Sequence, residues 1–204
     1  MSGYWISLEG GEGSGKTTLI RLIEEALQRQ GHDVLVTREP GGVPIAEQIR
    51  EVLLRIDNTA MDPITEALLF AASRRQHLIE KVLPALAAGR VVLMDRYVDS
   101  SIAYQGYARG LGMEAIKDLN DFAIQGNLPN ITFWIDVDPS VGLERISSNQ
   151  RNVNRLDKEV VEFHERVRQG YRLIADTDER LVVIDGHQTP ERIVQEILQK
   201  IEIR

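Results

Sequence analysis

The sequence feature that most constrains the fold is a glycine-rich loop that directly follows a short apolar segment. Residues 10–17 read GGEGSGKT, which fits the pattern G-x-x-x-x-G-K followed by Ser or Thr, and an amphipathic segment comes next. Glycines let successive backbone N–H groups point at one anion, and the positive end of a following helix strengthens the same field. A strand, this loop and a helix in that order predict a polyphosphate site.

Single positions of this loop have their own expected roles. Lys16 is expected to reach the terminal phosphates of a nucleoside triphosphate, and the Thr17 hydroxyl is expected to hold Mg²⁺. Glu12 has two interpretations, because a carboxylate repels phosphates: it faces a ligand hydroxyl, or it is a solvated acid at the loop tip. A glycine-rich turn that binds nothing is disfavoured by the complete motif. The predicted ATP-binding residues of the loop are Gly10, Gly11, Glu12, Gly13, Ser14, Gly15, Lys16, Thr17 and Thr18.

Apolar, β-branched segments alternate along the chain with longer segments of helical period. Such alternation predicts a doubly wound, five-stranded parallel α/β sheet flanked by helices. Residues 63–88 are rich in Ala and Leu and predict a long buried helix that bends near Pro84. The expected strands are Tyr4–Glu9, Asp33–Thr37, Val91–Met94, Ile131–Val137 and Leu181–Asp185, and further helices are expected at Pro44–Arg55, Met113–Ile124, Lys158–Asp176 and Pro190–Ile201.

Composition limits the class of protein. A length of 204 residues with 43% hydrophobic content predicts one domain, residues 1–204, with a sizeable core. The formal net charge of −7 lacks the basic footprint of a nucleic-acid binder, so polymeric DNA or RNA is not an expected partner. A small phosphorylated ligand needs only local cations and remains compatible with this charge.

Cysteine, histidine and apolar content point to a cytoplasmic protein without a zinc site. The absence of cysteine excludes disulfides and thiolate chemistry and suits a reducing compartment. The first residues lack a basic segment with a long apolar run, and no segment approaches the ~20 apolar residues that span a bilayer. The histidines show no metal-ligand spacing, and they are His32, His77, His164 and His187.

Charged residues follow the second and third expected strands. Asp95 and Arg96 come at the end of the third strand, and Arg38 and Glu39 come at the end of the second. The carboxyl ends of parallel strands share the edge where α/β folds bind ligands, so an acid there can hold water on Mg²⁺ and an arginine can bind phosphate. An ion pair that caps a strand is the alternative. Two arginines at one edge suggest a second anion site.

With these segments the chain resembles the thymidylate kinase family in its bacterial form, and the likeness runs nearly end to end. The matching segments are EGGEGSGKTT, TREPGG, FAASRRQH, DRYVDSSIAYQG and NRLD with its following acidic helix. The resemblance implies the P-loop NTPase fold, ATP and Mg²⁺ as cofactors, and transfer of the ATP γ-phosphate to dTMP. It also implies a homodimer formed through helices, although the apolar helix faces could equally be core.

The resemblance assigns residues to recognition of the dTMP base and sugar. It implies that Phe70 stacks on thymine, that Arg74 bonds a thymine carbonyl, and that Ser101 and Gln105 contact the pyrimidine edge. Tyr104 resembles the wall that crowds a ribose 2′-hydroxyl. Without the family, Phe70 is more typical of core and Arg74 of surface, and Ser101 and Tyr104 could be simple helix surface.

The resemblance also assigns the phosphate and metal contacts. It implies that Arg38 and Arg96 bind the acceptor phosphate, and that Glu39 and Asp95 are acids near metal and phosphate. Glu12 belongs to this dTMP site as well as to the loop. Thr17 and Asp95 are the predicted Mg²⁺ ligands, Asp95 through water.

The polar segment near residues 147–157 resembles the lid of the family. Arg151 and Arg155 are expected to stabilise the transferring phosphoryl group together with Lys16, Arg96 and Asp95. A solvated charged loop is the alternative. Arg145 resembles the residue that lies against adenine, and helix surface is the alternative place for it. Two other functions stay open at this stage: a P-loop kinase for another pyrimidine nucleotide or nucleoside, and a nucleotide-binding protein without turnover.

Overall fold

Five short strands form one parallel sheet in the order β2-β3-β1-β4-β5. The computed structural model describes residues 3–148 and 154–203. The strands are β1 (Tyr4–Glu9), β2 (Val34–Arg38), β3 (Val91–Asp95), β4 (Ile131–Asp136) and β5 (Leu181–Asp185). In register, Asp95 of β3 lies opposite Leu8 of β1 and Arg38 of β2, so these three strands end at one level.

The sheet confirms the predicted doubly wound parallel architecture, and each predicted strand boundary agrees with the structure to within one residue. Short β-branched runs between helical segments carried this prediction, because strands buried on both faces are apolar throughout. Trp5 and Ile6 are neighbours on β1 that point to opposite faces, and both are buried.

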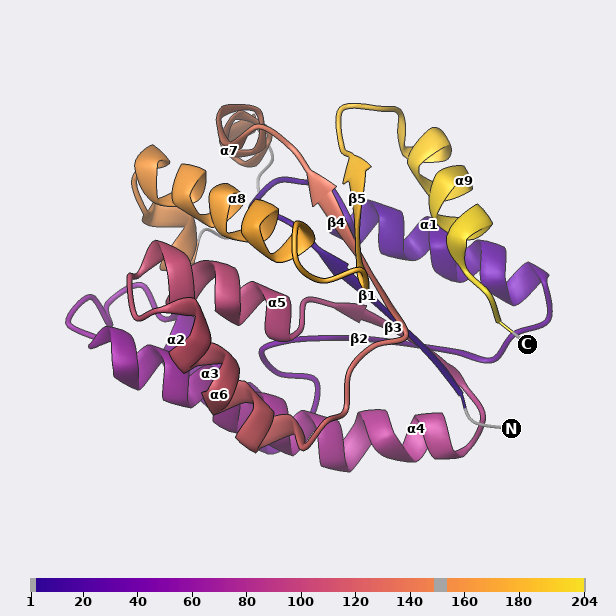
Figure 1. The fold of residues 1–204 in the computed structure, drawn as a ribbon, viewed down its shortest axis with the longest axis horizontal. Coiled ribbons are helices and arrows are strands. Elements are labelled where there is room, and N and C mark those ends of the chain that lie inside the picture. Colours follow the sequence, from indigo (N-terminus) through magenta and orange to yellow (C-terminus); the bar gives the residue numbers. More distant parts are fainter. Residues whose placement is uncertain (1–2, 149–153, 204) are drawn as a thin grey trace.

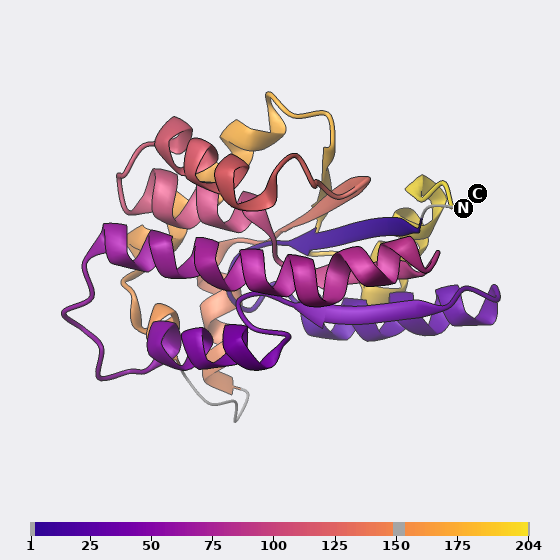
Figure 2. The ribbon, with the colours of Figure 1, turned by 90° about the horizontal axis from the view of Figure 1, so that it is seen from below.

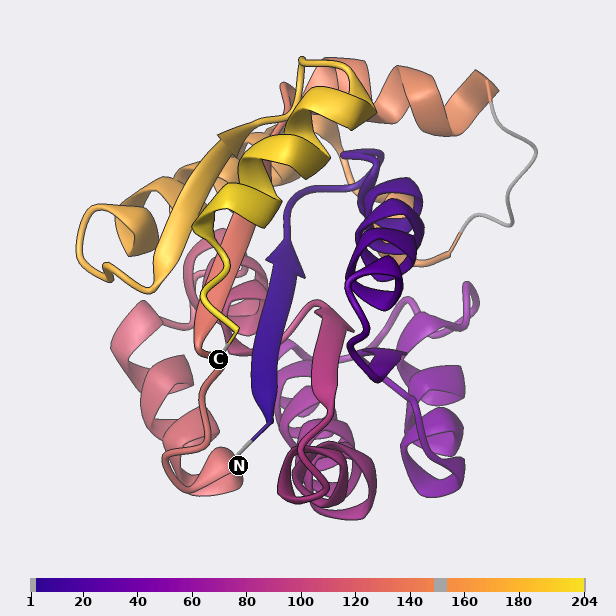
Figure 3. The same cartoon turned by 90° about the vertical axis from the view of Figure 1, so that its right-hand side faces the viewer.

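One face of the sheet is covered by α1 (Lys16–Arg29) and α9 (Pro190–Lys200), which lie on the same side in Figure 1. Ile6 and Leu8 of β1 pack with Ile23 of α1 and Ile197 of α9 in one apolar cluster. Figure 3 shows the chain passing from the tip of β1 through the glycine-rich loop into α1. This packing fixes the direction in which α1 presents its N-terminus to the carboxyl edge of the sheet.

The other face is covered by α3 (Pro63–His77), α6 (Met113–Ile124) and α8 (Val161–Ala175), with α2 (Pro44–Leu54) packed on α3. Figure 2 shows the ribbon of α3 running on without a break through a π-helical turn (η1, Leu78–Val82) into α4 (Leu83–Ala87). The predicted long helix is therefore present, and its irregular segment precedes Pro84, which has no N–H to donate.

The structure also contains helices that the periodicity did not predict. The segment after β3 forms α5 (Val98–Ser101) and a π-helical continuation, η2 (Ile102–Ala108), and α7 (Pro139–Ser148) follows β4. The helix predicted from Lys158 begins only at Val161, because residues 156–158 form a 3-10 turn, η3 (Leu156–Lys158). In the part of the chain described, no helix is both long and apolar enough to cross a bilayer.

Candidate active site

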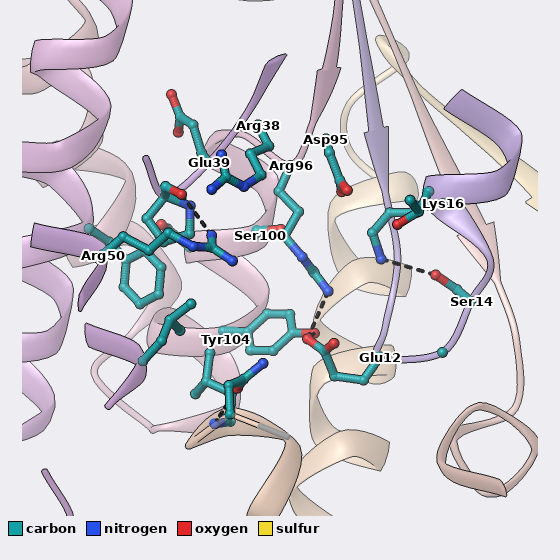
Figure 4. Close-up of a pocket in the computed structure, with 18 of the residues that line it drawn as sticks. Glu12, Ser14, Lys16, Arg38, Glu39, Arg50, Asp95, Arg96, Ser100 and Tyr104 are labelled. Atoms are coloured by element: carbon teal, nitrogen blue, oxygen red, sulfur yellow. Dashed lines mark hydrogen bonds and ion pairs between the residues drawn. The ribbon is translucent and has the colours of Figure 1, made fainter. Parts of the chain in front are cut away.

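A cavity of about 510 Å³ lies at the carboxyl edge of the sheet, between the glycine-rich loop and the ends of β2 and β3. Figure 4 shows side chains from all three elements pointing into it. Among the described residues that line the cavity, six are cationic and three are acidic. The chain carries a formal charge of −7, so positive charge is concentrated where the sequence predicted anions to bind. The cationic residues are Lys16, Arg38, Arg50, Arg74, Arg96 and Arg145.

The glycine-rich loop has the conformation of an anion cradle. Gly15 is the N-cap of α1 and has φ of 89°, in the left-handed region that favours glycine. At Gly13 the loop touches α7 so closely that an added Cβ would lie 2.0 Å from the carbonyl oxygen of Gly142. This contact brings α7 over the loop. Gly10 and Gly11 are part of the loop but do not line the cavity, whereas Glu12, Gly13, Ser14, Gly15, Lys16, Thr17 and Thr18 do.

Lys16 is a buried cation held by the loop itself. Its Nζ donates to the carbonyl oxygens of Gly10 and Gly11, each at 3.0 Å, and to Ser14 Oγ at 3.1 Å. Burial, together with the charge of Arg96, lowers the pKa of Lys16 from 10.5 to about 8. A phosphate beside the ammonium group opposes both effects, so binding of an anion is coupled to full protonation of Lys16.

Arg96 lies at the centre of the site with a strained backbone. Its φ is 68°, which is uncommon for a residue other than glycine and is typical of functional sites. Its guanidinium pairs with Glu12 at 2.8 Å, donates to Ser100 at 3.2 Å and lies over the ring of Tyr104 at 5.2 Å (Figure 4). The Glu12 side chain is thus only 12% exposed and paired with a cation, so its interpretation as a solvated acid is wrong. The negative charge that the loop places near phosphates is neutralised by Arg96.

Glu9 holds the segment that carries Arg96, a role that was not predicted from the sequence. Its buried carboxylate accepts hydrogen bonds from the Tyr97 amide at 2.6 Å, from Ser100 Oγ at 2.5 Å and from Tyr171 Oη at 2.8 Å. Burial, with the nearby charge of Asp99, raises the pKa of Glu9 to about 7. The signal was present, because an acid at the end of a buried strand needs several donors.

Asp95 and Thr17 both line the cavity, and their oxygen atoms are of the kind that Mg²⁺ binds. Asp95 Oδ1 is buried without a hydrogen-bond partner in residues 3–148 and 154–203. A buried carboxylate oxygen without a donor suits a hard cation, which takes oxygen ligands and keeps several waters. In the same residues no cluster of three or more His, Cys, Asp or Glu side chains could hold a metal by itself. The alternative interpretation of Asp95 and Arg96 was an ion pair that caps the strand. In the described residues Arg96 pairs with Glu12 instead.

Arg38 and Arg50 form a second cationic wall, on the far side of Arg96 from Lys16 in Figure 4. Arg38 makes a two-bond ion pair with Glu47, at 2.9 and 3.1 Å. Arg50 donates to the Pro40 carbonyl oxygen at 2.7 Å, and burial with the neighbouring charge of Arg38 lowers its pKa. Sequence reasoning missed Arg50, which lies on α2 far from any motif.

Arg74 lies in the core rather than on the surface that its residue type would favour. Only 2% of it is exposed, and its Nε donates to Glu39 at 2.8 Å. His77 holds the other oxygen of Glu39 at 3.0 Å and also bonds Thr37 at 2.7 Å, so it fixes this acid. Sequence analysis left His77 without a role, although its three-residue spacing from Arg74 on a helix places both on one face.

The remaining predicted base contacts all line the same cavity. Phe70 is half-buried and lines the cavity, so it is not a core residue. Ser101, Tyr104 and Gln105 are each at most 3% exposed and line it too, so the interpretation of Ser101 and Tyr104 as helix surface is wrong. Gln105 donates through Nε2 to Glu66 at 2.8 Å.

Comparison with known proteins identifies the family of this fold and site. The family model for thymidylate kinase matches residues 8–197. The chain belongs to the thymidylate kinase family. It is 55% identical to the thymidylate kinase of Halalkalibacterium halodurans, over 99% of this chain and 97% of that protein. It is 55% identical to that of Bacillus pumilus, over 99% and 96%, and 51% identical to that of Clostridium novyi, over 96% of each.

The lid expected for a thymidylate kinase lies partly outside the described residues. Arg151 belongs to that part. Arg155 is described, and its side chain is 10% exposed. Its guanidinium donates to the Leu53 carbonyl oxygen at 3.0 Å and pairs with Glu66, and Arg155 does not line the cavity. Ser147, predicted in the lid loop, lies on α7. Arg145 on the same helix lines the cavity and bonds the Gly13 carbonyl oxygen at 3.5 Å.

Proposed function

We propose that this chain is a kinase that transfers the γ-phosphate of ATP to dTMP, giving dTDP and ADP for dTTP synthesis. The observation that carries the proposal is that one cavity is lined both by the phosphate loop and by the residues predicted to contact the base, which are Phe70, Arg74, Ser101, Tyr104 and Gln105. The two substrates therefore meet with their phosphates between Lys16 and Arg96. Membership of the thymidylate kinase family supports the same reaction.

The base pocket presents one donor and one acceptor to a pyrimidine. Arg74 has five N–H groups, and in the described residues four of them have acceptors: Glu39, Ser101, Asn120 and the Tyr97 carbonyl oxygen. One Nη2 hydrogen therefore remains for a carbonyl of the base. Gln105 supplies the acceptor, Phe70 supplies a ring face, and Tyr104 limits the room at the sugar so that deoxyribose is preferred.

Charge distribution in the cavity suits transfer between two phosphates. We assign Arg38, Arg50 and Arg96 to the phosphate of dTMP, and Lys16 with the loop amides to the β- and γ-phosphates of ATP, with Arg145 beside adenine. An oxygen of the dTMP phosphate attacks the γ-phosphorus in line, and the bond from that phosphorus to the bridging oxygen of ADP breaks. Lys16 and Arg96 neutralise the charge that spreads over the transferring group, so alignment and electrostatics do most of the catalysis.

Mg²⁺ is the cofactor that the site fits. The Thr17 hydroxyl and the Asp95 carboxylate would hold it, Asp95 through water, and when bound it supplies charge neutralisation at the phosphates. Arg151 and Arg155 are the proposed lid cations. Because Glu66 holds Arg155 outside the cavity wall, Arg155 can take this role only if that ion pair opens. Turnover of Arg151→Ala and Arg155→Ala variants separates the two.

The test is a coupled assay for ADP release with ATP, Mg²⁺ and each acceptor at equal concentration. The proposal expects rapid, magnesium-dependent turnover with dTMP and much slower turnover with UMP or thymidine. Turnover with a different acceptor would keep the phosphoryl chemistry and overturn the base assignments. Loss of turnover with every acceptor, despite ATP binding, would favour a nucleotide-binding protein. Lys16→Ala and Arg96→Ala must each abolish the rate.

We also propose that the protein is a cytoplasmic homodimer that pairs through α2, α3 and α6. These helices lie side by side (Figure 2) and carry exposed apolar side chains: Ile45, Val52, Ile64, Leu68 and Phe122, the last 82% exposed. Apolar groups gathered in this way favour a partner surface over water. By light scattering we expect twice the mass of one chain for the wild type, and the mass of one chain for the double variant Leu68→Asp/Phe122→Asp. A monomeric wild type would contradict the proposal.

A further inference from the structure

A further buried carboxylate, Glu66, bonds a residue of the base pocket and has been given no role in recognition of the base. Glu66 is on the first turn of α3, and its side chain is 2% exposed. Among residues 3–148 and 154–203 its partners are Gln105 at 2.8 Å, Arg109 at 3.3 Å through two nitrogens, and Arg155. A carboxylate held from three sides by two cations and an amide has one orientation and little freedom to turn.

The ionised state of Glu66 fixes the amide of Gln105. Hydrogen bonds from Gln105, Arg155 and Arg109 and the charge of Arg109 outweigh burial and lower the pKa of Glu66, so it is a carboxylate at neutral pH. A carboxylate accepts hydrogen bonds and donates none. The amide group that faces Glu66 must therefore be the NH₂ of Gln105, and the opposite assignment of the amide would set oxygen against oxygen.

The amide oxygen of Gln105 is left on the other side. In the described residues it accepts no hydrogen bond, although Gln105 itself is 1% exposed and lines the cavity. Arg74, with one N–H to give, lines the same cavity. An acceptor and a donor offered to one ligand match a pyrimidine edge with a protonated N3 and a carbonyl at C4. Cytosine presents the reverse pattern, an unprotonated N3 and an amino group.

We propose that Glu66 is a positioning residue that sets base selectivity: by holding the NH₂ of Gln105, it makes the pocket read a protonated N3 and reject cytosine. This inference rests on the proposed function, because it concerns the base of the same acceptor. Glu66 does not touch the base. Its effect on the base passes through the hydrogen bond from Gln105 to Glu66. The ion pairs that Glu66 makes with Arg109 and Arg155 take no part in this effect.

The experiment replaces the carboxylate by an amide of the same shape. In Glu66→Gln the residue can donate or accept, so Gln105 is free to turn and to present NH₂ to an unprotonated N3. Dissociation constants for dTMP, dUMP and dCMP are measured by calorimetry, which does not depend on turnover. We expect the preference for dTMP over dCMP to fall by at least tenfold, while the ratio of dTMP to dUMP, which share this edge, stays within twofold.

Arg109→Gln is the matched control. It removes the two-bond ion pair between Arg109 and Glu66 but leaves the bond from Gln105 to Glu66. We therefore expect lower thermal stability with an unchanged preference for dTMP over dCMP. If Glu66→Gln weakens all three nucleotides in parallel, Glu66 has only a structural role and the inference is overturned. If the wild type shows no turnover with dTMP in the ADP-release assay, the proposed function fails instead, and the two failures are thereby distinguished.

A measurement on the wild type applies if Glu66→Gln does not fold. In protein labelled with ¹⁵N-glutamine, the NH₂ protons of Gln105, assigned with Gln105→Ala, are expected to exchange slowly with water both without ligand and with dTMP bound. Fast exchange in the complex, equal to that of exposed glutamines, would mean that the NH₂ has left Glu66 and would overturn the inference.

Discussion

The buried ammonium group of Lys16 gives a prediction whose size follows from the structure. In the folded protein the pKa of Lys16 is about 8, against 10.5 when the side chain is free in water. Between these two values the unfolded chain binds more protons than the folded one, so this residue makes the stability rise with pH. The two pKa values give a gain of about 2 kcal/mol in the free energy of unfolding between pH 7 and pH 9.5.

Lys16→Met removes this titration and keeps an unbranched side chain of similar length. Urea denaturation of wild type and variant at pH 7, 8, 8.5 and 9.5 gives the difference in unfolding free energy, in which other titrating groups largely cancel. We expect the wild type to gain about 2 kcal/mol relative to the variant across this range, or about 4–8 °C in Tm. Parallel curves, with a difference constant to about 0.5 kcal/mol, would refute a lowered pKa for Lys16.

Three further predictions concern protons and phosphate. ATP binding is measured by calorimetry in buffers of different ionisation enthalpy, which gives the number of protons taken up. We expect uptake of about half a proton at pH 8 and almost none at pH 6.5, because phosphate restores the charge of Lys16. Equal uptake at both pH values would contradict this. Arg50→Ala is expected to raise KM for dTMP about tenfold to a hundredfold at an unchanged KM for ATP. The control variant Arg55→Ala, at an exposed arginine of the same segment, is expected to change neither KM. A shift in both KM values would contradict the assignment of Arg50 to the dTMP phosphate. Glu9 has a raised pKa of about 7, so the folded state binds more protons than the unfolded state between pH 4.5 and 7, and stability falls with rising pH there. Glu9→Gln therefore gains stability relative to wild type over that range in urea denaturation, and a pH-independent difference would count against a shifted pKa.

The parts of the fold that were predicted correctly are those that a local pattern of residues in the sequence determines. Buried parallel strands are short apolar runs, and the phosphate loop has a fixed spacing, so both could be located without tertiary information. The helix over residues 98–108 was missed because its polar residues point into the cavity and its π-helical turns break the 3.6-residue period. A helix that lines a polar site does not show an ordinary apolar face.

Residues of the site divide in the same way. Phe70 and Arg74 were assigned through the family motif, and their residue types alone favoured core and surface. Arg50 and Glu66 lie outside the quoted motifs, and Glu9 opens one of them without a role that the motif states. The places of Glu9 and Glu66 depend on contacts with elements distant in sequence. Such partners can be identified only from the folded structure, in which the carboxyl ends of the strands lie together. A local sequence pattern does not contain this information.

The measurement that tests the proposed reaction most directly is transfer of label. ATP labelled with ³²P in the γ-phosphate is incubated with the protein, Mg²⁺ and dTMP, and the products are separated by chromatography. We expect the label to leave ATP and to appear in dTDP in equal amount, and to stay in ATP when dTMP is omitted or when Lys16→Ala replaces the wild type. Label found in inorganic phosphate, with dTMP unchanged, would contradict transfer to dTMP.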